Sequence, residues 1–296
     1  DVVLPVLFAE AFAEEAPEVS DAVAVTYWPG GSSPLEGLAL QRAEAVVVYG
    51  SDEVVSSFRA RTPVTASFIS YHHRLSLGMV GREALTVARA PDVARMAARA
   101  VSMFDQRGCV SPHAIYVEEG GAVDPGEWAA LLASAMADLE VEIPGGYLTA
   151  PEASAVHQVR GSAELREASG GGVRVFRGDE SFWTVILEDE MTFTRSCLNR
   201  VVSLVPTPDL GGVATSLGMI GRHLQTVAIE GAEDRLPTLA EDLCRAGATR
   251  VTSFEKAPWP PPWWRHDGAS VLAGLVRWID LEGVDLEEFD PAGPGD

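Results

Sequence analysis

The stretch of sequence that decides the fold reads FDQRGCVSPH and occupies residues 104–113. It follows a run with helical spacing and precedes an apolar, strand-like run at residues 114–117. A cysteine directly after a glycine, at a turn from helix to strand, can have the backbone room, N–H donors and partial exposure that a reactive thiolate needs. Cys109 is therefore a candidate nucleophile. The alternative is inert packing, because free cysteines are among the most buried residues.

On both sides of this stretch, strand-like runs alternate with helix-like runs. Before it, strands are expected at residues 22–28, 45–49 and 64–69. After it, the alternation continues with longer helices as far as residue 254. Continuous apolar strands between helices are typical of a parallel sheet that is covered on both faces. The sequence thus predicts an α/β fold with two Rossmann-like parallel-sheet units in tandem.

We place the first unit at residues 1–82 and the second at residues 83–256. The third part, 257–296, begins with the run APWPPPWW, which proline excludes from a helix or a central strand. We expect an ordered crossing there, then a last helix at 270–280 and a flexible tail. The chain begins with Asp1 just before an apolar segment, so we also expect it to be an excerpt of a longer protein.

The charge balance restricts the possible partners. The 43 acidic residues outnumber 22 lysines and arginines, and the net charge is −21. Such a surface repels nucleic acid and anionic membranes, so we expect neither as a partner. Uninterrupted apolar runs also fall short of the roughly 18 residues that a membrane span needs. Three widely spaced cysteines argue against a disulfide framework and indicate a reducing, cytoplasmic location.

Other candidate residues follow the predicted strands. Gly50 and Ser51 come after the strand at 45–49 and before a helix, where a helix N-terminus can hold a pyrophosphate, although an ordinary N-cap is the alternative. His72 and His73 come after the strand at 64–69 and are candidate acid–base groups near Cys109. The six histidines show no short metal-ligand spacing, so no metal site is expected. The sequence also contains no GxGxxG, P-loop or GxSxG motif.

The late turn WWRHDG, at residues 263–268, is rich in functional groups. Its tryptophans are expected to pack, and His266 and Asp267 to hydrogen-bond locally.

The order of these motifs is similar to the aldehyde dehydrogenase superfamily. FDQ-x-GC-x-SPH, Tyr-Trp-Pro-Gly-Gly at 27–31 and Trp-x-x-His-Asp-Gly resemble its acyl-CoA reductase branch, which includes the fatty-acid reductase subunit of bacterial luminescence systems. In that comparison the segment 76–80 forms a glycine-containing turn. The resemblance runs over residues 1 to about 284. It implies an aldehyde-dehydrogenase-like fold that lacks the N-terminal part.

The resemblance also implies a mechanism. Cys109 would take an acyl group from a long-chain acyl-CoA or acyl-carrier thioester, and hydride from NADPH would reduce it through a thiohemiacetal to a fatty aldehyde. Gly50 and Ser51 would contact the cofactor. The enzyme would be an NADP-dependent oxidoreductase, either a homo-oligomer or part of a multi-subunit reductase complex. This chemistry requires a lowered pKa for the Cys109 thiol.

Departures from the oxidising relatives sharpen this hypothesis. Their glutamate, which activates the water that releases the acid, falls near Tyr71 here, where no carboxylate stands. Its absence favours reduction. The family's phosphate-contacting lysine and oxyanion asparagine would lie before Asp1. Two alternatives remain: an oxidising aldehyde dehydrogenase, and a non-catalytic α/β binding module in which Cys109 is buried and inert.

Overall fold

The computed structural model describes residues 3–189, 193 and 195–283, which form two compact units. The first unit contains residues up to His72 together with the segment from Gly274 onward, and the second contains His73–Ala273. The boundaries predicted from the sequence are after residues 82 and 256. The strand after His73 belongs to the second unit because both its neighbours in the sheet are strands of that unit.

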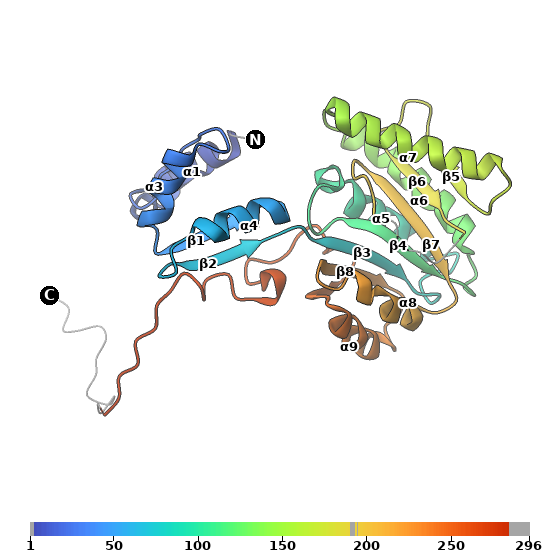
Figure 1. The fold of residues 1–296 in the computed structure, drawn as a ribbon. Helices are drawn as coiled ribbons and strands as arrows, with labels where there is room; N and C mark the ends of the chain where they lie inside the picture. The colour runs from blue at the N-terminus through green and yellow to red at the C-terminus, as the bar shows by residue number, and fades with distance from the viewer. Residues whose placement is uncertain (1–2, 190–192, 194, 284–296) are drawn as a thin grey trace. The chain divides into compact units, whose positions relative to one another are not determined.

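The first unit is built around a pair of parallel strands (Figure 1). The strands pair in an unbroken register from Ala45 opposite Ser67 to Tyr49 opposite Tyr71, and the two tyrosine rings stack with centroids 4.4 Å apart. The elements are α1 (Val3–Glu15), α2 (Pro17–Ser20), α3 (Ser33–Arg42), β1 (Ala45–Tyr49), α4 (Asp52–Arg61) and β2 (Ser67–Tyr71). This is the strand–helix–strand order that the sequence predicts for residues 45–71.

The second unit holds a seven-stranded sheet in the order β5-β6-β7-β4-β3-β8-β9, in which only β5 is antiparallel to its neighbour. Its strands are β3 (Leu75–Val80), β4 (Pro112–Glu118), β5 (Arg174–Phe176), β6 (Thr184–Leu187), β7 (Val201–Thr207), β8 (Leu224–Glu230) and β9 (Arg250–Thr252). Its helices are α5 (Ala90–Ser102), α6 (Pro125–Glu142), α7 (Ala150–Ala168), α8 (Leu210–Ser216) and α9 (Leu236–Ala246). Short 3₁₀ turns are η1 (Met103–Gln106), η2 (Leu217–Met219) and η3 (His266–Gly268).

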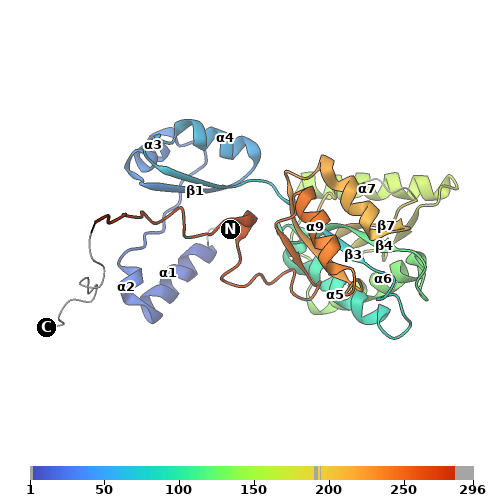
Figure 2. The ribbon, with the colours of Figure 1, turned by 90° about the horizontal axis from the view of Figure 1, so that it is seen from below.

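Helices cover both faces of this sheet (Figures 1 and 2). Alternate residues of each strand point to opposite faces. In β4, Ile115 and Val117 join the core under α5 and α6, whereas Ala114 and Tyr116 join the core under α8 and α9. Helix α7 packs on β5, β6 and β7 through a smaller third core. The predicted α/β fold with a helix-covered parallel sheet is confirmed.

The layers of the second unit approach each other closely at Gly78 in β3. A Cβ atom at that position would lie 2.6 Å from the ring of Phe254 and 2.9 Å from Ile115. Both side chains are fully buried, so neither has room to move. Glycine is therefore required for the approach of backbone to side chain here.

Three sequence predictions of secondary structure are wrong. Residues 22–28 form no strand, because no other strand pairs with them, and the segment lies largely exposed. Residues 270–280 form turns and extended chain instead of a last helix. The segment 76–80 is the buried core of strand β3 and not a turn. The predicted flexible tail at 291–296 lies outside the described residues.

The carboxyl end of β4 is locked by one buried carboxylate. Glu118 is fully buried and forms ion pairs with Arg235 at 2.7 Å and Arg82 at 3.2 Å. It also accepts hydrogen bonds from the backbone N–H groups of Arg82 and Leu210. Burial alone would raise the pKa of this carboxyl, but the hydrogen bonds from Arg235 and Arg82 outweigh it and lower the pKa to about 2.

The lowered pKa predicts an acid-dependent loss of stability. A carboxyl whose pKa falls from 4.5 to about 2 on folding stabilises the native state above pH 4.5 and loses that contribution as the pH falls toward 2. The contribution is roughly 3 kcal/mol. Urea unfolding at several pH values should show this loss in the parent protein and not in Glu118→Gln. Equal pH dependence in the two proteins would contradict the assignment.

Candidate active site

The FDQ residues form a left-handed turn between α5 and the cysteine. Phe104, Asp105 and Gln106 have φ values of 57°, 50° and 62°. Residues other than glycine rarely adopt such values, and several in a row need support from the surrounding structure. This run, which we name the first turn, therefore indicates that the backbone before Cys109 is held in one defined conformation.

A second left-handed turn holds the first one in place. Leu198, Asn199 and Arg200 have φ values of 68°, 56° and 60°. The Asn199 N–H donates to the Asp105 carbonyl oxygen at 3.0 Å, and Arg200 Nε donates to Asp105 Oδ1 at 2.8 Å. The Arg200 side chain is only 2% exposed and also donates to the carbonyl oxygen of Ile143 at 2.8 Å. The two turns are thus joined by a buried ion pair and a backbone hydrogen bond.

Gln106 closes the loop that carries the cysteine. Its side chain is fully buried, and its Nε2 donates to the carbonyl oxygen of Pro112 at 2.8 Å. Its Oε1 accepts from the hydroxyl of Ser196 at 3.2 Å, next to the second turn. Both ends of the segment 106–112 are therefore fixed, with half-buried Cys109 between them.

Cys109 lies at the amino-terminal edge of the parallel sheet, just before β4. The Ser76 hydroxyl donates to the Cys109 carbonyl oxygen at 2.5 Å and accepts from the Thr226 N–H at 3.2 Å. Ser76 thereby ties the cysteine to β3 and β8. The register of β3 shifts beside Ser76 against both β4 and β8. Such bulges re-aim side chains and are common next to active sites.

Polar side chains from distant parts of the chain surround the thiol. Burial raises the pKa of Cys109, the amide of Gln225 opposes this, and the carboxylate of Asp267 adds to the rise. The family resemblance implies a lowered pKa for this thiol, but the pKa is raised here because the half-buried sulfur loses hydration. The thiol is therefore protonated at neutral pH in this state, and it must lose its proton before it can attack.

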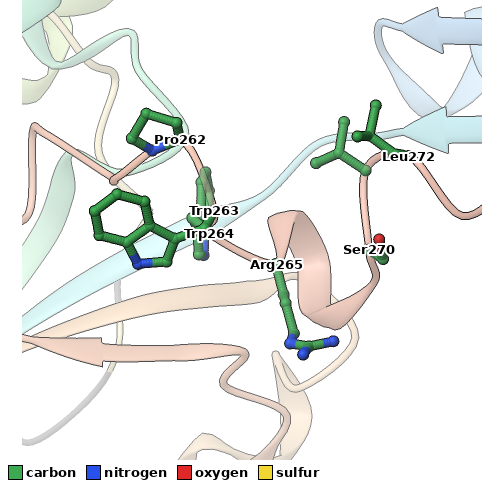
Figure 3. Close-up of a pocket in the computed structure, with 7 residues that line it drawn as sticks. Pro262, Trp263, Trp264, Arg265, Ser270 and Leu272 are labelled. Atoms are coloured by element: carbon green, nitrogen blue, oxygen red, sulfur yellow. The ribbon is translucent and has the colours of Figure 1, made fainter. Parts of the chain in front are cut away.

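The WWRHDG turn reaches this edge of the sheet. Asp267 accepts from Gln225 Nε2 at 2.7 Å and pairs with Arg74 Nε at 3.0 Å, and both partners lie far from it in the sequence. The rings of Trp264 and His266 stack at 4.5 Å. Beside them is a cavity of about 240 Å³, with Pro262, Trp263 and Trp264 on one side and Ser270 and Leu272 on the other (Figure 3).

His73 lies in a group of basic side chains. Its Nε2 is 2.6 Å from Arg195 Nη2, and its carbonyl oxygen accepts from His223 Nδ1 at 3.1 Å. Its charge, with that of Arg195, adds to burial in lowering the pKa of His113 to about 4. His72 is half-buried at the end of the first unit. An acid–base role for His72 or His73 stays a prediction.

Gly50 and Ser51 form the turn between β1 and α4. The Ser51 hydroxyl accepts from the Val54 N–H at 3.4 Å, as an N-cap does. A Cβ atom on Gly50 would lie 2.8 Å from Val54, so the close approach of the turn to the helix requires glycine. Cofactor contact by this pair stays a prediction.

Sequence reasoning missed Arg74, Ser76, Arg200 and Gln225. No motif marks them, because each reaches the FDQRGC segment or Asp267 only through folding. The positively charged Arg200 in an apolar stretch was the one available signal, since a buried charge requires a partner. The described residues hold no cluster of three or more metal-ligating side chains, and no described helix is long and apolar enough to cross a membrane.

A scan against protein-family models matches residues 1–278 to the acyl-CoA reductase family, LuxC. The chain belongs to the acyl-CoA reductase (LuxC) family. The resemblance inferred from its motifs is confirmed. A comparison with curated proteins finds no significant match.

Solved structures with this fold are aldehyde dehydrogenases and related oxidoreductases. An oxidoreductase from Marinobacter aquaeolei is 14% identical, with a TM-score of 0.58 over 79% of this chain and 50% of its own. A variant of aldehyde dehydrogenase C from Pseudomonas syringae, in complex with NAD⁺ and octanal, is 14% identical, with a TM-score of 0.56 over 80% of this chain and 50% of its own.

An NADP-dependent glyceraldehyde-3-phosphate dehydrogenase from Bacillus halodurans, in complex with NADP, is 11% identical, with a TM-score of 0.56 over 76% of this chain and 48% of its own. At these identities the likeness shows the fold. The matched region amounts to about half the length of these three proteins.

The buried ion pair between the two turns predicts a large effect of mutation in this family member. Asp105→Ala removes the carboxylate and leaves the buried Arg200 guanidinium without its counter-charge, which should lower the free energy of unfolding by about 3 kcal/mol or more. Denaturant unfolding measures this change. Glu241→Ala breaks an exposed pair with Arg245 and should change the value by less than about 0.5 kcal/mol. Equal losses in the two variants would contradict the assigned role.

Proposed function

We propose that this chain carries the catalytic cysteine of an acyl-CoA reductase, an oxidoreductase that converts a long-chain fatty acyl thioester into a fatty aldehyde. One observation carries the proposal: Cys109 follows a strained turn that a buried ion pair fixes, in a chain of the acyl-CoA reductase family. Packing alone does not account for three consecutive left-handed residues so close in the chain to a half-buried thiol.

The first half-reaction is acyl transfer to Cys109. The Cys109 sulfur forms a bond to the carbonyl carbon of the acyl thioester while the bond from that carbon to the CoA sulfur breaks. The proton from the Cys109 thiol goes to the departing CoA thiolate. Burial raises the pKa of the Cys109 thiol and so opposes the loss of its proton. The Gln225 amide favours the charged sulfur and therefore supports this step.

A nicotinamide cofactor is the proposed reductant. The turn at Gly50 fits a phosphate group in shape, because glycine lets the backbone come close and the N-terminus of α4, with Ser51 as its N-cap, begins there. The backbone N–H groups at the start of α4 and the Ser51 hydroxyl would hold the phosphate group. The carboxylate of Glu53 would oppose this binding, and its pKa is lowered by a hydrogen bond with Ser51. When bound, the cofactor would supply hydride to the acyl carbon. The bond from that carbon to Cys109 then breaks, the aldehyde leaves, and the sulfur takes up a proton.

The surroundings of the thiol support reduction over hydrolysis. Asp267 is the carboxylate that acts on Cys109, but one of its oxygens accepts from Gln225 and the other faces Arg74. A carboxylate held in this way is poorly placed to activate water. The acyl group on Cys109 would therefore persist until reduction.

The proposal has five further parts. The first unit would form part of the dinucleotide-binding domain, and the second would form the catalytic domain. NADPH is the proposed form of the cofactor, and acyl-CoA or an acyl-carrier thioester the donor. The enzyme would act in the cytoplasm. It would assemble as a homo-oligomer or within a multi-subunit reductase complex.

Replacement of the nucleophile tests the proposed function. In the intact protein, Cys109→Ala should abolish covalent labelling by radioactive acyl-CoA, because it removes the proposed acyl acceptor. Cys244→Ala, which removes an exposed cysteine on α9, is the matched control and should label as the parent does. Undiminished labelling of Cys109→Ala would overturn the proposal.

A further inference from the structure

We propose that Gln225 and Asp267 act together as positioning residues for Cys109, with Asp267 fixing the Gln225 amide so that its N–H group faces the sulfur. The catalytic meaning of this pair rests on the proposed function. Its geometry joins the start of β3, the start of β8 and the WWRHDG turn. Asp267 contacts both Gln225 and Arg74, and the Ser76 hydroxyl links the Cys109 carbonyl oxygen to the N–H of the residue that follows Gln225.

Asp267 is held firmly enough to act as the fixed point. Its side chain is 8% exposed, and it pairs at 3.0 Å with Arg74, which is 13% exposed. Arg74 is fixed in turn, because its Nη1 donates to the carbonyl oxygen of Arg222 at 2.7 Å. The backbone of Asp267 is left-handed, with φ of 54°, and the glycine that follows also has a positive φ. Together these contacts aim the carboxylate at β8.

The carboxylate determines which way the Gln225 amide points. Gln225 is fully buried, and its Nε2 donates to Asp267 Oδ1 at 2.7 Å. The reversed amide would place its oxygen against the carboxylate, so charge excludes that orientation. An amide nitrogen carries two hydrogens, and the second is available to the Cys109 thiol, on which Gln225 acts. Oε1 of Gln225 is buried and has no hydrogen-bond partner among the described residues.

The two residues act on the sulfur in opposite directions. The Gln225 amide favours the thiolate and the Asp267 carboxylate disfavours it, while Arg74 on the β3 side favours it. Arg250 at the start of β9 is a further cation that interacts with the thiol, and His266 lies beside Asp267. The pair thus directs the Gln225 N–H group toward the sulfur, while the Asp267 carboxylate keeps the sulfur from being charged at all times. Removing either member should shift the reactivity of Cys109, with a different sign for each.

The test uses two variants of similar size in the intact protein. Iodoacetamide alkylation of Cys109 is followed against pH by peptide mapping. Asp267→Asn removes the negative charge and should move the alkylation midpoint to lower pH, whereas Gln225→Met removes the N–H donor and should move it to higher pH. Both should lower kcat for acyl-CoA reduction by roughly tenfold to a hundredfold, with a smaller change in KM, because a misplaced nucleophile slows the chemical step.

Controls separate this inference from a general loss of structure. Asp138→Asn makes the same chemical change at an exposed site on α6 and should leave the midpoint and kcat unchanged. Thermal unfolding of each variant confirms folding. Unshifted midpoints in both folded variants, or shifts of the same sign, would overturn the inference. Opposite shifts would support the positioning pair even if Cys109→Ala still accepted the acyl group, in which case the proposed function alone would fail.

Discussion

The ion pair between Asp105 and Arg200 is the interaction on which the candidate site depends. It joins two left-handed turns. Neither turn would keep its conformation alone, because each contains three non-glycine residues at positive φ. The Arg200 side chain is only 2% exposed, and its other N–H groups donate to the carbonyl oxygens of the two residues that follow α6. The conformation of the first turn therefore depends on the start of β7 and on the end of α6. The first turn then sets the direction in which the chain runs through Cys109 into β4.

A second constraint comes from the edge of the sheet. Ser76 breaks the register of β3 against both neighbours and uses its hydroxyl to hold the backbone of Cys109. The thiol consequently lies at the amino-terminal edge of the parallel strands. Ligands of open α/β sheets usually lie at the carboxyl edge. In the first unit, the turn at Gly50 follows the carboxyl end of β1 and so lies at this usual edge. The candidate site in the first unit is therefore at the carboxyl edge of its sheet, and the one in the second unit is at the amino-terminal edge.

Much of the fold could be predicted because its signals are local. The apolar runs at 45–49 and 184–187 are long enough to identify strands, and Thr149 and Asp124 begin helices with capping boxes. Residues 22–28 show the limit of this reasoning, because their β-rich composition has no partner strand in the structure. Composition shows what a segment could form, but pairing decides what it does form.

The candidate site was predictable only in part. Cys109 was marked by the FDQRGC motif, but the residues that act on it come from far along the chain. Asp105 and Arg200 are 95 positions apart, and Gln225 and Asp267 are 42 apart. The raised pKa of Cys109 was missed for the same reason, since burial and the charge of Asp267 arise only when these segments meet.

The most direct test of the account is a single-turnover experiment on the intact enzyme with acyl-CoA, with the modified residue located by mass spectrometry. Without a nicotinamide cofactor, the acyl group should be found as a thioester on the peptide that contains Cys109. On addition of NADPH it should disappear as the fatty aldehyde forms. Acylation at Cys197 or Cys244 alone, or aldehyde formation without an acylated Cys109, would contradict the account.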